Sequence, residues 1–185
     1  MAMKRFPLEQ YATLELNQVA FPKTGMVVSQ TPLGSEFTKD APCENGMWVL
    51  ADKSKGTIGS IANVADTPVG IVYTAEKEYD MYHYGLKTFG RKIAGDYPRV
   101  GILGLGDTVT TNCLQYDDTE FATEAALYAT LEAWESTPVY VVPVAGSPVP
   151  KLTATKPAEN IYGKVTKFYT VPNGEKGVKY QIVNL

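Results

Sequence analysis

The stretch YGKVTKFYTV (residues 162–171) alternates apolar and polar side chains, which is typical of a β-strand with one buried face. The turn-forming segment PNGEKG (172–177) follows it, and VKYQIV (178–183) then places Val178, Tyr180 and Ile182 on one face. We expect a closing antiparallel hairpin over residues 162–183.

The composition of the whole chain agrees with this local pattern. The strand-forming residues Val, Ile, Thr, Tyr, Phe and Trp account for 64 of 185 residues. A further 28 residues are Gly or Pro, so the strands must be short and often interrupted. The expected fold class is mainly β with one packed α-helix (α+β), as a small β-barrel or sandwich with an extended N-terminal arm.

One segment has helical character. Residues 117–135 begin with DDTE, which resembles a capping box, and continue as an Ala-rich run. One broad side of this run carries Phe121, Leu127, Tyr128, Leu131 and Trp134. We expect a helix over 117–135 that packs on a sheet. Its acidic first residues fit the helix macrodipole and need no metal or acid–base role.

Residues 26–75 read as short strands and turns within a β-rich domain that spans 26–185. GMWVLAD (46–52), the turn KSKG (53–56) and TIGSI (57–61) predict a hairpin, and VGIVYT (69–74) predicts another strand. Further along, the G-x-x-G-x-G of 101–106 precedes β-branched residues and no helix, so we interpret it as a turn and not as a dinucleotide site. Residues 139–144 predict a strand in which Pro143 marks an edge or a bulge, followed by a linker or long loop over 145–150.

The N-terminal residues 1–25 are expected to form an extended arm. Two Phe-Pro steps, at 6–7 and 21–22, favour extended backbone, and YATLELN (11–17) has apolar residues at alternate positions. Large apolar side chains in this arm must be buried, either on the chain's own domain or on a neighbour. They are candidate partner-binding residues: Phe6, Leu8, Tyr11 and Phe21.

A second aromatic segment, YDMYHY (79–84), also has two open interpretations. Tyrosine offers rigid amphipathic contact area, so Tyr79, Tyr82 and Tyr84 are candidate partner-binding residues. The same rings could instead alternate into the core of a strand.

Charge and composition argue against several kinds of site. The formal net charge is −3, with no Lys/Arg run, so we expect no nucleic-acid partner. With two cysteines and one histidine, we expect no metal site, no cofactor, no catalytic residue and no enzymatic activity. Cys43 and Cys113 are expected to be reduced core residues, although a disulfide between them stays open. We also expect no signal peptide and no membrane span, and synthesis in a cytoplasm.

Three stretches carry a resemblance to a known family. PCENGMWVLAD (42–52), the Lys55-Gly56 turn and PVGIVYT (68–74) resemble the head decoration (cement) proteins of tailed bacteriophages. The segments GDTVTTN (106–112) and YTVPNG (169–174) are similar in style to phage virion structural proteins. The resemblance is strongest over residues 26–75, where it implies a small β-barrel, and the helix over 117–135 departs from it.

The resemblance implies a structural virion protein that binds the major capsid protein and copies of itself. It would sit between capsomers and stiffen the shell, with the arm adding a strand or seating aromatic anchors on a neighbouring subunit. Two alternatives remain at this stage. One is a tail-tube or baseplate subunit, and the other is a carbohydrate-binding module with Trp48, Tyr82 and Tyr84 on an exposed platform.

Overall fold

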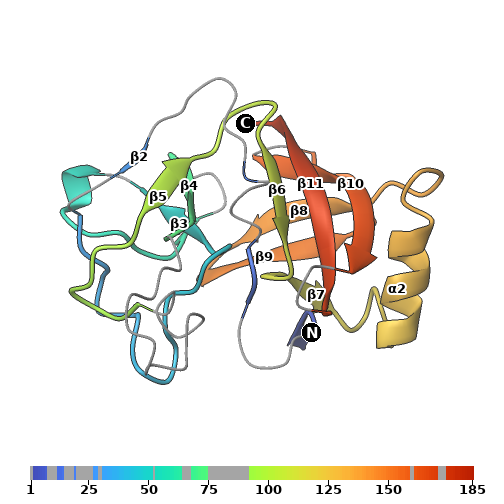
Figure 1. The fold of residues 1–185 in the computed structure, drawn as a ribbon, viewed down its shortest axis with the longest axis horizontal. Coiled ribbons are helices and arrows are strands. Elements are labelled where there is room, and N and C mark those ends of the chain that lie inside the picture. Colours follow the sequence, from blue (N-terminus) through green and yellow to red (C-terminus); the bar gives the residue numbers. More distant parts are fainter. Residues whose placement is uncertain are drawn as a thin grey trace.

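The computed structural model describes residues 2–7, 12–14, 19, 27–28, 31–51, 53–63, 68–74, 92–158, 161–170 and 174–185. Its strands form two sheets that lie side by side, with helix α2 at the outer end of the larger one (Figure 1). The expected fold class, mainly β with one packed helix, is confirmed.

The larger sheet has seven strands in the order β1-β7-β9-β8-β10-β11-β6. They are β1 (Met3–Arg5), β6 (Thr108–Thr111), β7 (Gln115–Asp117), β8 (Tyr140–Val144), β9 (Ser147–Thr153), β10 (Tyr162–Thr170) and β11 (Lys176–Asn184). All neighbours pair antiparallel except β7 and β9, which pair parallel. Among the strands described, β1 and β6 are the two edges and do not pair with each other, so no closed barrel forms.

The hairpin predicted at the C-terminus is the pair β10–β11. Val178, Tyr180 and Ile182 are all buried, as the alternation predicts. A register shift between Val165 and Lys167 interrupts the pattern on β10. Phe168 therefore packs against the core.

The smaller sheet has the order β2-β5-β4-β3, with all pairs antiparallel. Its strands are β2 (Val27–Val28), β3 (Trp48–Leu50), β4 (Val69–Val72) and β5 (Val100–Ile102). The predicted hairpin over 46–61 is largely wrong, because β3 pairs with β4. A 3-10 turn, η2 (Lys53–Lys55), follows β3, and one isolated bridge joins Leu50 to Gly59.

Helix α2 spans Glu124–Glu132 and is shorter than the predicted 117–135. The acidic residues expected to open it have other partners. Asp117 ends β7 and accepts hydrogen bonds from the N–H and hydroxyl of Thr119 at 2.9 and 2.7 Å, and Glu120 accepts from the hydroxyl of Thr153 at 2.9 Å. Thr123 is the N-cap, with its Oγ1 3.1 Å from the Ala126 nitrogen.

Residues 145–150 do not form the expected linker. Val144 pairs with Ser147, so Ala145 and Gly146 form a two-residue turn between β8 and β9. Gly146 has φ +75°, a conformation that glycine adopts without strain. The bulge predicted at Pro143 is confirmed by the register shift between Val142 and Val144.

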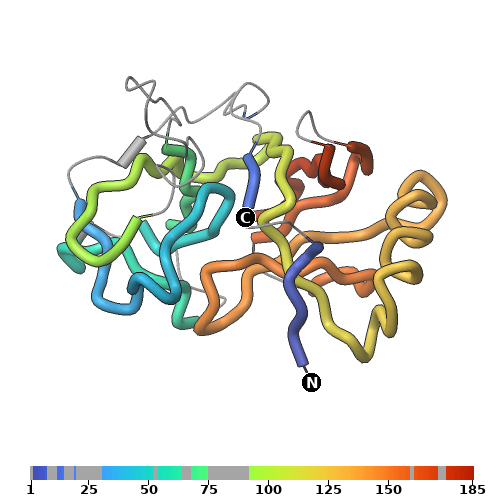
Figure 2. Tube along the Cα trace, turned by 60° about the horizontal axis from the view of Figure 1, so that its bottom comes forward, coloured from blue at the N-terminus to red at the C-terminus, as the bar shows by residue number. Residues whose placement is uncertain are grey.

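The described parts of the N-terminal arm lie on the chain's own larger sheet. Strand β1 pairs antiparallel with β7, and the blue N-terminal segment runs beside it in Figure 2. Phe6 follows directly, is fully buried, and packs with the ring of Tyr128 at 5.9 Å. Leu14 forms an antiparallel bridge with Thr111. Phe6 is therefore an anchor of this chain's own core and not of a neighbouring subunit.

The two sheets share one hydrophobic cluster. Trp48 of β3 and Tyr180 of β11 are both fully buried, and their ring centroids are 6.0 Å apart. The Trp48 Nε1–H donates to the Tyr180 hydroxyl at 2.9 Å, so two large aromatic side chains bury both their apolar faces and their polar atoms. The burial of Trp48 removes it from any exposed sugar-binding platform.

Candidate functional site: a pocket between the two sheets

An open pocket lies where β1 and the β8–β9 turn approach residues 36–47. Its volume is about 460 Å³, within the range of roughly 300–1,000 Å³ that is usual for ligand sites. The residues that line it come from four separate parts of the chain: Arg5, Glu36, Phe37, Asp40, Ala41, Pro42, Glu44, Met47, Ser60, Gly146, Pro148 and Val149.

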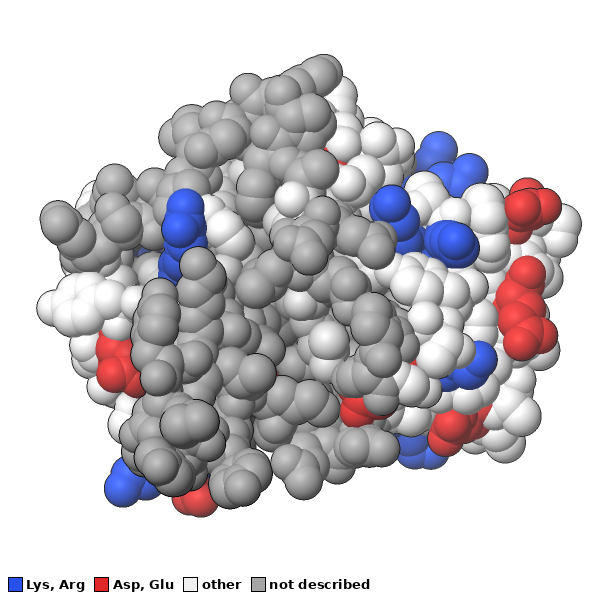
Figure 3. All heavy atoms as spheres, viewed as in Figure 1, with Lys and Arg blue, Asp and Glu red and all other residues white. Residues whose placement is uncertain are grey.

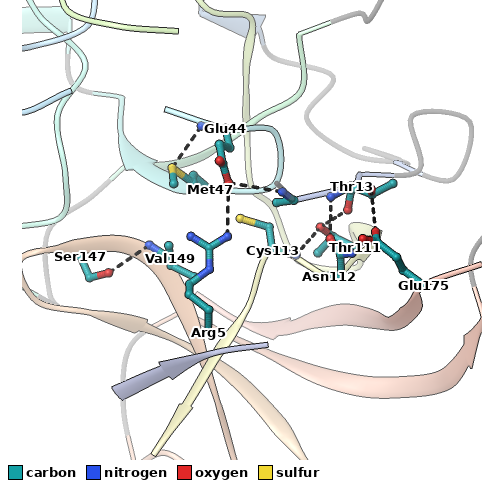
Figure 4. A network of polar contacts seen from close by, with 11 residues as sticks. Arg5, Thr13, Glu44, Met47, Thr111, Asn112, Cys113, Ser147, Val149 and Glu175 are labelled. Atoms are coloured by element: carbon teal, nitrogen blue, oxygen red, sulfur yellow. Dashed lines mark hydrogen bonds and ion pairs between the residues drawn. The ribbon is translucent and has the colours of Figure 1, made fainter. Parts of the chain in front are cut away.

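Glu44 is the buried polar residue of this pocket. Its side chain lies 3.3 Å from the Arg5 guanidinium, Nη2 to Oε2, and the same oxygen accepts from the Ala12 backbone N–H at 3.4 Å (Figure 4). Glu44 is 8% exposed. Burying a carboxylate is costly unless it is paired and hydrogen-bonded, so Arg5 and Ala12 together offset that cost. The contact also ties the N-terminal strand to the loop before β3.

The pocket keeps a negative balance after this pairing. Glu36 accepts from the Ser60 backbone N–H at 3.0 Å, and Asp40 is exposed with no ion pair in the part of the chain that the structure describes. Three carboxylates against one guanidinium leave a formal charge of −2 at the lining. Such a lining attracts a cationic group.

The inner wall of the pocket is apolar. Phe37, Met47 and Val149 are each at most 5% exposed and belong to the smaller core cluster. An apolar wall with carboxylates around it suits a lysine or arginine side chain, whose aliphatic stem packs while its charged head stays near the carboxylates.

A second polar network fixes the arm beside this pocket. The Asn112 amide accepts from the Thr13 backbone N–H and donates to Glu175 at 2.8 Å, and the Thr111 hydroxyl donates to the Thr13 carbonyl at 2.6 Å. The same Thr111 hydroxyl accepts from the backbone N–H of Cys113 at 2.9 Å (Figure 4). These contacts join residues 12–14 to the end of β6 and to the turn before β11, so the arm is held at two points.

The two cysteines lie near the pocket but are unsuited to nucleophilic chemistry. Both are buried free thiols in the smaller core cluster. Burial raises the pKa of the Cys113 thiol to about 12, and burial with the nearby Cys113 and Glu44 raises that of Cys43 further. Because the thiolate is the reactive form, both groups stay protonated and inert at neutral pH.

The sequence-predicted binding residues are only partly placed. Phe6 lies in the core, whereas Leu8, Tyr11, Phe21, Tyr79, Tyr82 and Tyr84 are outside the described residues. Arg5, Glu36, Asp40 and Glu44 were not predicted as site residues. Glu36, Asp40 and Glu44 recur at intervals of four residues, but the segment that carries them is not helical, so this spacing predicted no shared site. Arg5 and Val149 come from segments about 30 and 100 positions away, which no local pattern connects to it.

Within the described ranges, no group of three or more His, Cys, Asp or Glu residues is placed to hold a metal ion. No helix in that same part of the chain is long and apolar enough to span a bilayer. Comparison with known protein families, curated proteins and solved structures gives no match.

Proposed function

We propose that this chain is a structural virion protein that binds the assembled capsid of a tailed bacteriophage between capsomers and stabilises the shell. The proposal begins from the resemblance of residues 42–52 and 68–74 to head decoration proteins. In the fold these two stretches contain β3 and β4, which pair as neighbours, so they belong to one structural unit.

The observation that carries the proposal is the position of the pocket. Pro42, Glu44 and Met47, from the stretch that resembles decoration proteins, line a solvent-accessible pocket of negative balance. A basic side chain projecting from a capsid subunit is the ligand that suits this pocket. One such contact is weak, but the regular copies of a capsid surface supply many equivalent contacts, each chain stabilising its own junction.

The described part of the arm packs on its own chain and was expected to bind a neighbouring subunit. Since Phe6 and Leu14 are buried in the chain's own core, deleting residues 1–22 would remove core packing as well as any contact with a neighbour. We assign the described arm the task of positioning Arg5 against Glu44, which closes one side of the pocket.

A substitution series at Asp40 tests the pocket without disturbing the core. Asp40 is exposed, so Asp40→Asn and Asp40→Lys should both fold. The assay is co-sedimentation with assembled shells that lack this chain. We expect the affinity for shells to fall about fivefold for Asp40→Asn, because a partly exposed ion pair worth about 1 kcal/mol is lost. The affinity should fall further for Asp40→Lys, because the charge is reversed.

Asp40→Asn is also the matched control for shape, since it keeps the size of the side chain and removes its charge. Wild-type protein that does not co-sediment with shells would overturn capsid binding. Binding that is equal for all three proteins would instead remove the pocket from the contact.

A further inference from the structure

The outer face of hairpin β10–β11 carries a group of lysines. Lys164, Lys167 and Lys179 point away from the core, since the intervening Val165 and Tyr180 are buried. Lys167 is directly opposite Lys179 in the strand register. Figure 3 shows basic side chains over this hairpin, beside acidic side chains at the helix end of the molecule.

These lysines are not neutralised within the described part of the chain. Neither ion pair found there involves them, and the Lys167 ammonium lies over the Tyr169 ring, 5.3 Å from its centroid. Like charges directly opposite each other on adjacent strands repel and destabilise the pair. The arrangement therefore costs free energy in the single chain, and an anionic surface placed over it would recover that cost.

An acidic surface exists on the same chain, at the C-terminal end of α2. Glu132 is the last residue of α2 and Glu135 follows in the next turn; both are exposed and neither has an ion pair among the described residues. The carbonyl end of a helix carries partial negative charge, so carboxylates there are unfavourable for the helix itself. Helix stability does not explain them.

We propose that the basic face of hairpin β10–β11 is a docking surface for a second copy of this chain, which presents the acidic end of its α2. Lys167 and Lys179 are directly opposite each other on adjacent strands, and Glu132 and Glu135 are both exposed where α2 ends and in the turn that follows it. The two lysines of one copy therefore face the two carboxylates of the other with opposite charge. Each repulsive pair in one copy becomes an attractive contact with the other.

The contact joins two different surfaces, so it is head-to-tail: one copy keeps its acidic end free and the other keeps its basic face free. Exposed ion pairs are individually weak and screened by salt, so we expect two copies to associate only weakly in dilute solution. Where copies are held side by side, many such contacts act together and the association becomes stronger. The inference concerns copy-to-copy contact and does not depend on capsid binding.

Zero-length cross-linking detects such a weak contact. Unlabelled and ¹⁵N-labelled wild-type chains are mixed at low ionic strength without any capsid, treated with a carbodiimide and digested for mass spectrometry. We expect mixed-isotope peptides that join Lys167 or Lys179 to Glu132 or Glu135, with yields at least tenfold lower in 0.5 M NaCl. Absence of mixed-isotope links between these segments, or links only elsewhere, would overturn the proposal.

Charge reversal supplies matched controls, all at exposed or half-buried side chains. The hairpin variant (Lys167→Glu, Lys179→Glu) and the helix variant (Glu132→Lys, Glu135→Lys) should each lose self-association in sedimentation velocity at high protein concentration. An equimolar mixture of the two should regain it, because each then supplies the surface that the other lacks. Circular dichroism checks the fold of both, and a mixture that stays monomeric while wild type associates would contradict the assignment.

Discussion

At the scale of single residues, the hydrogen bond between Trp48 and Tyr180 is the polar link across the two sheets. Tyr180→Phe keeps the ring and removes the hydroxyl, which leaves the buried Trp48 Nε1–H without its acceptor. We expect the free energy of unfolding to fall by about 1–3 kcal/mol in urea denaturation. Tyr97→Phe, at a side chain that is 64% exposed, is the control and should change stability little.

Two glycines with similar backbone conformations separate strain from steric clash. Gly46 has φ +92° and Gly106 has φ +95°. A Cβ at Gly46 would lie 2.6 Å from the Cys113 Cβ, whereas a Cβ at Gly106 meets nothing within 4 Å. We expect Gly106→Ala to cost about 1–2 kcal/mol from conformation alone and Gly46→Ala clearly more, by thermal denaturation. Equal losses would show that Cys113 and its neighbours move aside freely.

Asp107 predicts a specific pH dependence. It is fully buried in the turn predicted from the G-x-x-G-x-G segment; one carboxylate oxygen accepts from the Gly104 N–H at 2.7 Å, and the other has no hydrogen-bond partner among the residues that the structure describes. Burial raises its pKa above the ordinary 3.8, although the Gly104 hydrogen bond opposes the shift. The folded chain therefore holds this proton more tightly than the unfolded chain, and its contribution to stability falls as the pH rises through the folded pKa.

Asp107→Asn removes that titration while keeping an oxygen for Gly104. We expect the stability of the variant relative to wild type to be higher at pH 7 than at pH 4, measured by urea denaturation at both pH values. A relative stability that instead rises toward pH 4 would contradict a raised pKa at Asp107.

At the scale of elements, the start of α2 shows how tertiary contacts override a local signal. The DDTE segment has the sequence of a helix cap, but its carboxylates bond elsewhere. Glu120 accepts a hydrogen bond from the Thr153 hydroxyl, and Asp117 accepts one from the backbone N–H of Thr119. Thr123 therefore caps the helix, and Thr123→Ala should lower the free energy of unfolding by about 1 kcal/mol. Thr123→Asn keeps a capping group and should restore most of it in the same denaturation assay.

The strands were largely predictable where alternation or turn chemistry is local. The closing hairpin, the strand at 69–72 and the bulge at Pro143 all follow from neighbouring residues. The bulge near Thr166 and the β8–β9 turn were not predicted. Register shifts depend on partners far along the chain, and a Gly-Ser-Pro stretch suits a tight hairpin as well as a loop.

At the scale of the whole molecule, the candidate site depends on contacts that no local pattern encodes. Arg5 contacts Glu44 because β1 pairs with β7, a strand more than 100 residues further along the chain. Val149 also lines the pocket, because the β8–β9 turn places the start of β9 beside it. The arm was predicted as a separate segment, yet its described part contributes Phe6 and Leu14 to the core. Sequence patterns identified the elements, whereas the pocket arises from the order in which the sheet assembles them.

We propose that this chain is a structural component of a phage head, and quantitative mass spectrometry of tailed-phage particles purified from a host that carries its gene tests this proposal. We predict that the chain is present in a copy number comparable with that of the capsid subunits, and that particles emptied of DNA and freed of tails retain it. Its absence from purified particles, or its presence in a few copies that leave with the tails, would show that it is not a head protein.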